Sequence, residues 1–69
     1  MSEATDLAVA AGNADPAVGL RAVAALRRLL ERLESAQVRN ARGRGWTWQQ
    51  IATGLGVTRQ AVHKKYKGE

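Results

Sequence analysis

Four polar side chains near the C-terminus have types and a spacing suited to recognition: Arg59, Gln60, His63 and Lys64. If this segment is helical, these side chains lie on the outward face, opposite Val62 and Tyr66. An arginine guanidinium can donate two hydrogen bonds to O6 and N7 of guanine, and a glutamine amide can pair with N6 and N7 of adenine. The chemistry that these residues could perform is therefore the binding of base edges.

The charge of the chain is concentrated in the half that holds these residues. Residues 39–69 carry four Arg and three Lys against one acid, a net charge of +6, whereas residues 1–38 carry four Arg against five acids, a net charge of −1. A basic half of this kind predicts a polyanionic partner. We expect no membrane partner, because the basic residues interleave with Gly and Gln and do not oppose a broad apolar face.

A short helix is predicted just before the recognition residues. Its apolar positions recur at i, i+3, i+4 and i+7, which places them on one helical face: Trp48, Ile51, Ala52 and Leu55. Thr47 with Gln50 three residues later forms a capping-box pattern. Trp46 is placed to pack on Ile51 as a hydrophobic staple, and the spacing assigns Trp46 and Trp48 to the core.

A second short helix follows after a turn. Thr58 is a candidate N-cap, and Val57 is placed to pack on Val62. Between the two helices, Gly56 stands where the chain needs a positive φ to leave one helix and begin another at a steep angle. Two capped helices joined by such a turn predict a tightly packed helix pair.

The segment from residue 46 to 66, WTWQQIATGLGVTRQAVHKKY, resembles the helix-turn-helix of bacterial DNA-binding proteins. Ile51 and Ala52 match the first helix, Leu55-Gly56-Val57 the turn and Val62 the buried position of the second helix. The sequence departs from this pattern at one position. The late apolar residue of the second helix would fall at Lys65, which is charged, and the next residue, Tyr66, takes its place. Over residues 16–67 the chain resembles compact actinobacterial proteins that combine one long helix with this motif. Some of them are nucleoid-associated proteins that bind short sites, including GATC-like ones.

This resemblance implies an all-α, three-helix, dimeric domain that binds double-stranded DNA as a nucleoid-associated protein or a transcription regulator. In helix-turn-helix proteins the second helix enters the major groove, which implies base contacts by Arg59, Gln60, His63 and Lys64; for His63 an ordinary surface role is the alternative. The expected contacts to the DNA backbone are Arg42, Arg44, Thr47, Gln49, Thr58, Lys65 and Lys67.

A long helix is predicted over residues 15–42, because Asp15 suits an N-cap and Pro16 the first helical position. Its apolar residues span about 160°, wider than the stripe of roughly 100° typical of a surface helix. We expect one edge to pack on the helix-turn-helix. The other is expected to form a homodimer interface through Val23, Leu26, Leu30 and Leu33. The alternative is that one monomer uses the whole stripe.

The remaining residues bound the function. We expect a flexible tail over 1–14, with a short helix over 4–11 as the alternative, and one helical DNA-binding domain over 15–69 with its helix-turn-helix at 46–67. With no Cys and one His, we expect no metal, cofactor or small-molecule ligand, and no enzyme, since no acid pair or phosphate-cradling loop is present.

The acidic N-terminus argues against a signal peptide and favours the cytoplasm, at the nucleoid. The alternative function is a protein-interaction adaptor or antitoxin-like module built on the same motif.

Overall fold

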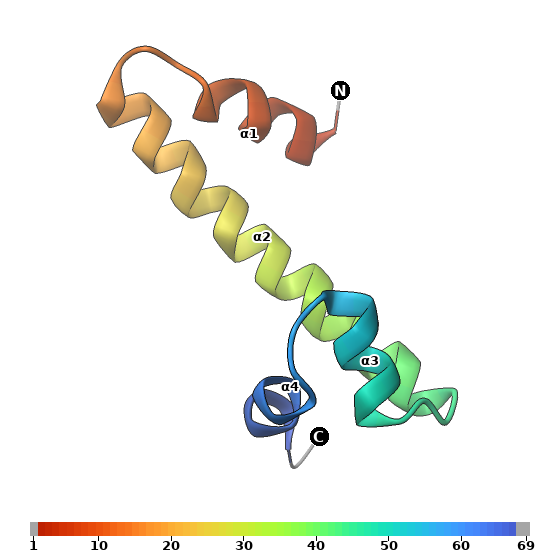
Figure 1. Cartoon of the computed structure of the whole chain (residues 1–69). Helices are drawn as coiled ribbons and strands as arrows, with labels where there is room; N and C mark the ends of the chain where they lie inside the picture. The colour runs from red at the N-terminus through yellow and green to blue at the C-terminus, as the bar shows by residue number, and fades with distance from the viewer. Residues whose placement is uncertain (1, 68–69) are drawn as a thin grey trace. The chain divides into compact units, whose positions relative to one another are not determined.

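Four α-helices account for most of the residues that the structure, a computed structural model, describes, which are residues 2–67 (Figure 1). No β-strand occurs within this range, so the predicted all-α class is confirmed. The last two residues of the domain predicted over 15–69 lie outside the described residues. The chain divides into two units, Met1–Glu34 and Ser35–Glu69, and one helix continues from the first into the second.

The first helix, α1, spans Glu3–Ala11, where the sequence favours a flexible tail. Ser2 caps it, because its hydroxyl accepts a hydrogen bond from the backbone N–H of Thr5 at 3.1 Å. Gly12 closes its end by donating a backbone hydrogen bond to the carbonyl of Val9. The expectation of a tail is wrong for these residues, since a good N-cap and an alanine-rich stretch favour a helix of nine residues.

The long helix, α2, spans Pro16–Gly43 and confirms the predicted helix to within one residue at each end. Asp15 is its N-cap, because the carboxylate accepts a hydrogen bond from the N–H of Ala17 at 3.0 Å. The side-chain oxygen of Asn13 in turn accepts from the N–H of Asp15 at 2.8 Å. The connection between the first two helices is therefore fixed by local hydrogen bonds.

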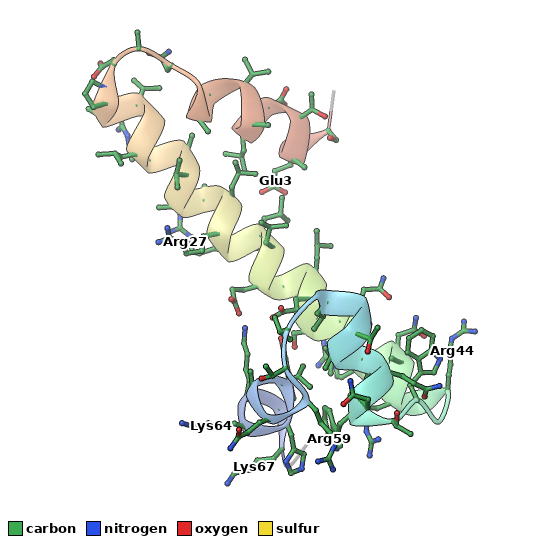
Figure 2. All side chains as sticks on the ribbon, viewed as in Figure 1. Glu3, Arg27, Arg44, Arg59, Lys64 and Lys67 are labelled. Atoms are coloured by element: carbon green, nitrogen blue, oxygen red, sulfur yellow. The ribbon has the colours of Figure 1, made fainter. Side chains whose placement is uncertain are left out.

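Gly19 explains how α1 and α2 approach each other within the first unit. This glycine is buried, and a Cβ added to it would lie 3.3 Å from the carbonyl oxygen of Asn13 and 3.4 Å from that of Ala11. Any larger residue would push the connection away from α2. At the far end of α1, Glu3 forms an ion pair with Arg32 at 3.9 Å, and both side chains are largely exposed (Figure 2). Such a pair contributes little to stability.

The second unit contains the end of α2, then α3 (Trp48–Leu55) and α4 (Arg59–Tyr66) (Figure 1). Its core consists of five buried residues, one on α2 and two on each short helix: Val38, Ile51, Ala52, Val62 and Tyr66. Ala41 and Trp48 pack against this cluster. The core confirms that Tyr66 occupies the late apolar position of α4.

The part of α2 that enters this core differs from the expected part. The sequence assigns an edge of the leucine stripe to it, but the core residues that α2 supplies are Val38 and the flanking Ala41. The physical reason is length, because α3 and α4 have eight residues each and span about 12 Å, enough for the last turns of α2.

Three apolar residues expected to pack remain partly exposed to solvent: Trp46, Leu55 and Val57. The assignment of Trp46 to the core is wrong, because its side chain is 44% exposed. Its backbone N–H instead donates to the carbonyl of Ala41 at 3.0 Å, which closes the loop after α2. Trp48, by contrast, is half-buried against the core.

We predict that Ala52→Leu destabilises the protein. Ala52 has an exposed fraction of 0%, so added methylene groups must displace α3 from its neighbours. Overpacking of this kind costs about 1–3 kcal/mol. Thermal unfolding measures the effect, with Ala61→Leu as control, since Ala61 is exposed on α4. Equal melting temperatures for the two variants would contradict the packing described above.

Candidate nucleic-acid interface

Helix α4 presents one buried and one exposed side. Val62 and Tyr66 are buried one turn apart, while every other described residue of the helix is exposed. At about 100° per residue, Gln60, Lys64 and the following Lys67 lie farthest from the buried side. Within the described residues, no hydrogen bond, ion pair or ring contact engages the side chains of Gln60, Lys64 and Lys67. They are therefore available to a ligand.

Two of the four predicted base-contacting residues lie on a flank of α4 and not opposite its buried side. Arg59 and His63 both fall on the flank next to the buried residues, one turn apart. The imidazole of His63 contacts the indole of Trp48 in a T-shaped arrangement, with 5.4 Å between ring centroids. Arg59 points outward with no intramolecular partner within the described part of the chain (Figure 2). The structure thus brings Arg59, Gln60 and Lys64 together as exposed groups and holds His63 against α3.

The predicted backbone-contacting threonines are both helix caps. The hydroxyl of Thr47 accepts from the N–H of Gln50 at 3.1 Å, and the amide oxygen of Gln50 accepts from the N–H of Thr47 at 2.8 Å. This confirms the predicted capping box. The hydroxyl of Thr58 accepts from the N–H of Ala61 at 3.1 Å, which confirms the second cap. Gln49 donates to the hydroxyl of Thr53 at 3.3 Å on the surface of α3.

The two arginines at the end of α2 have different surroundings. Arg42 donates to the carbonyl oxygen of Trp46 at 2.9 Å, and its guanidinium lies 4.5 Å from the centroid of the Trp48 ring. Arg44 is held by Asn40, whose side-chain oxygen accepts from its Nε at 3.1 Å. Figure 2 shows Arg44 in the turn after α2, away from the lysines of α4. The side chain of Arg42 is thus held on the surface by the loop and by Trp48, whereas that of Arg44 is held by Asn40 alone among the contacts of the described residues.

The electrostatics of the second unit are one-sided. Its described residues, 35–67, include seven basic side chains and no acidic one: Arg39, Arg42, Arg44, Arg59, Lys64, Lys65 and Lys67. No carboxylate within that range neutralises them. Lys65 lies on the opposite flank of α4 from His63, with its ammonium 5.5 Å from the centroid of the Tyr66 ring. A unit so composed attracts anions.

An apolar groove beside α3 has no counterpart in the sequence predictions. It has a volume of about 240 Å³ and runs between the end of α2 and α3; it is lined by Gln37, Val38, Asn40, Ala41, Arg44, Trp46, Ile51, Gly54 and Leu55. No residue of α4 lines it, so it lies on the flank of α3 away from that helix. The signal in the sequence is the pair of large apolar residues, Trp46 and Leu55, at the two ends of α3.

The residues predicted to form the dimer interface are accessible in the single chain. Leu30 and Leu33 are 61% and 52% exposed, Val23 is exposed to a smaller extent and Leu26 is half-buried. Leu20, for which the sequence predicts no role, is also exposed on α2. The first unit therefore carries an apolar surface on α2 that its own residues leave open to solvent.

Comparison of the chain with protein-family models, with curated proteins and with solved structures found no match. None of the helices within residues 2–67 has the length and apolarity needed to cross a membrane. The described residues also contain no group of three acidic, His or Cys side chains placed to hold a metal ion.

The turn between α3 and α4 predicts opposite effects for two nearby glycines. Gly56 has φ of 72° and supplies the left-handed residue that ends α3, so Gly56→Ala should destabilise by about 1 kcal/mol. Gly54 lies inside α3 with nothing within 4 Å of an added Cβ, so Gly54→Ala should stabilise by about 0.5–1 kcal/mol. Chemical denaturation compares the two, and a shift of the same sign in both would contradict the described turn.

Proposed function

We propose that the protein is a homodimeric helix-turn-helix protein that binds double-stranded DNA in a sequence-dependent manner, as a nucleoid-associated protein or a transcription regulator. In this proposal α3 and α4 form the motif, and α4 lies in the major groove. Arg59, Gln60, Lys64 and His63 would contact bases from α4. The flanking cations and the two helix caps would contact the phosphates.

The observation that carries this proposal is the absence of acidic side chains from residues 35–67, together with seven cations. Proteins that neutralise several phosphates need such an excess of Lys and Arg, because each contact releases condensed counterions. The side chains of Gln60 and Lys64 project from the exposed face of a short helix with a capped N-terminus, which suits entry into a groove. Charge and exposed hydrogen-bonding groups thus coincide on one element.

The exposed leucines of α2 support the homodimer. A second copy that packs on Leu30 and Leu33 would remove apolar surface from water, at roughly 25 cal/mol for each Å². Two recognition helices on one assembly would also contact two half-sites and raise affinity over a single one.

A protein-interaction adaptor is the second candidate, and the groove beside α3 favours it. Exposed Trp46 and Leu55 at its rim could anchor an apolar side chain of a partner protein. Salt separates the two functions. Binding of DNA should weaken steeply as salt rises, because counterion release drives it, whereas an apolar protein interface should change little.

We predict that Arg59→Ala and Lys67→Ala reduce DNA binding in different ways. Loss of a base contact at Arg59 should cost about 1–3 kcal/mol on a preferred duplex and reduce discrimination at one base pair. Loss of a phosphate contact at Lys67 should weaken binding to all duplexes alike. It should also reduce the salt slope, the steepness of log K against log salt concentration, by about one. Titrations of both variants against matched and scrambled duplexes at several salt concentrations measure this. If Arg59→Ala weakens every duplex equally, Arg59 contacts the backbone only.

We also predict that Leu30→Glu disrupts the dimer. The substitution would place an unpaired charge in the apolar interface, at a cost of about 3–5 kcal/mol. Sedimentation at micromolar concentration should show a dimer for the wild type and a monomer for the variant. Arg28→Glu is the control, since it places a carboxylate on the polar, exposed side of the same helix. A wild-type protein that sediments as a monomer would rule out this part of the proposal.

A further inference from the structure

A line of three side chains connects α2 to α4 across α3. The guanidinium of Arg42 lies 4.5 Å from the centroid of the Trp48 ring, and the imidazole of His63 lies 5.4 Å from the same ring at an interplanar angle of 67°. We refer to Arg42, Trp48 and His63 as the clasp. A planar cation on an aromatic ring and a T-shaped ring pair are both attractive. None of the three clasp residues is among the five buried residues of the core, although Trp48 packs against them.

Arg42 is fixed from two directions. Its terminal nitrogen donates to the carbonyl oxygen of Trp46 at 2.9 Å, so the loop after α2 holds the guanidinium where it meets Trp48. Each further phosphate contact by this side chain would have to compete with both interactions. Arg44, two residues later, has a side-chain hydrogen bond to Asn40, and no aromatic ring of residues 2–67 makes a cation–π contact with it. The two arginines therefore differ in surroundings although they are equal in charge.

The clasp bears on the rotation of α4, which the buried residues of that helix alone do not fix. Val62 and Tyr66 anchor α4 one turn apart, along a line nearly parallel to the helix axis, and two contacts on one line do not by themselves fix the rotation of α4 about that line. His63 projects about 100° around the helix from Val62, so its contact with Trp48 is a third point off the line. Three points that are not collinear fix both the tilt and the rotation of a helix.

Rocking would displace the outer face of α4 most. That face carries Gln60 and Lys64 and lies about 10 Å from the anchored side, so a rotation of roughly 10° moves it by about 1.7 Å. A hydrogen bond to a base edge needs donor and acceptor within about 2.7–3.2 Å, so a shift of this size breaks it. A flexible lysine on a phosphate can follow the same shift.

We propose that Arg42 is a positioning residue for α4 and acts through Trp48 and His63, so that it sets how well the protein distinguishes sequences. This inference rests on the proposed DNA-binding function. It replaces the phosphate contact that the sequence assigns to Arg42. Arg44 keeps that assignment.

Arg42→Lys tests the inference, because lysine retains the charge and loses the planar group. The probes are a duplex enriched by the wild-type protein from a randomised pool and a scrambled duplex of equal composition. Arg42→Lys should lower the ratio of the two affinities by about three- to tenfold and leave the salt slope unchanged. Arg44→Lys, the matched control, should leave the ratio unchanged, whereas Arg44→Ala should weaken both duplexes equally and lower the slope by about one. An unchanged ratio in Arg42→Lys overturns the inference.

A double-mutant cycle shows whether Arg42 acts through the clasp. In a His63→Ala background, Arg42→Lys should produce no further loss of discrimination, because the contact that it supports is gone. If the double variant lowers the affinity ratio by the product of the two single-variant factors, the two residues act independently, which overturns the inference. A purely structural role of Arg42 would lower the melting temperature and leave this coupling at zero.

A measurement without DNA separates failure of this inference from failure of the proposed function. The ring current of Trp48 should shift the His63 imidazole proton resonances, and Arg42→Lys should reduce that shift while Arg44→Lys does not. Equal shifts in the wild type and Arg42→Lys overturn the clasp even if the protein binds DNA. If the wild type enriches no duplex, the proposed sequence preference and this role in it both fail. The resonances then still decide whether the contact forms.

Discussion

The close approach of α3 and α4 at Ala52 is the constraint on which the second unit depends. Helices of eight residues are too short to be stable in water by themselves, since nucleation is unfavourable and few hydrogen bonds follow it. They persist because a residue without a long side chain lets the helices close over Val62 and Tyr66. All exposed cations of α4 take their positions from this small core.

Most local features of this unit follow from the sequence, because local rules govern them. The capping box at Thr47, the cap at Thr58 and the left-handed Gly56 each involve residues within a few positions of one another. Asp15 marks the start of α2 for the same reason. The sequence does not favour the helix over residues 3–11, because the apolar pattern there is weak, although Ser2 caps it.

The features that the sequence does not reveal arise between elements. Trp46 and Trp48 have the same side chain and the sequence assigns both to the core, yet Trp46 is 44% exposed and Trp48 is half-buried. What separates them is their element: Trp48 is the first residue of α3 and packs on the core, whereas Trp46 lies in the loop after α2, at the groove beside α3. Likewise, the charge of Arg42 predicts an anion contact, and only the position of the Trp48 ring beneath it indicates another role. Periodicity identifies faces of helices, but it does not say which neighbour meets each face.

The unbalanced charge of the second unit links its stability to its proposed ligand. Seven cations without a carboxylate among residues 35–67 repel one another, and this repulsion opposes folding around a core of five buried residues. A polyanion that binds the folded unit more tightly than the unfolded chain relieves the repulsion and stabilises the fold by RT ln(1 + [L]/Kd). On the proposed function, the arrangement that attracts DNA also makes the free unit less stable than its packing alone would allow. On the proposal made above, the clasp would position α4 in the free protein, before a polyanion binds and relieves this repulsion.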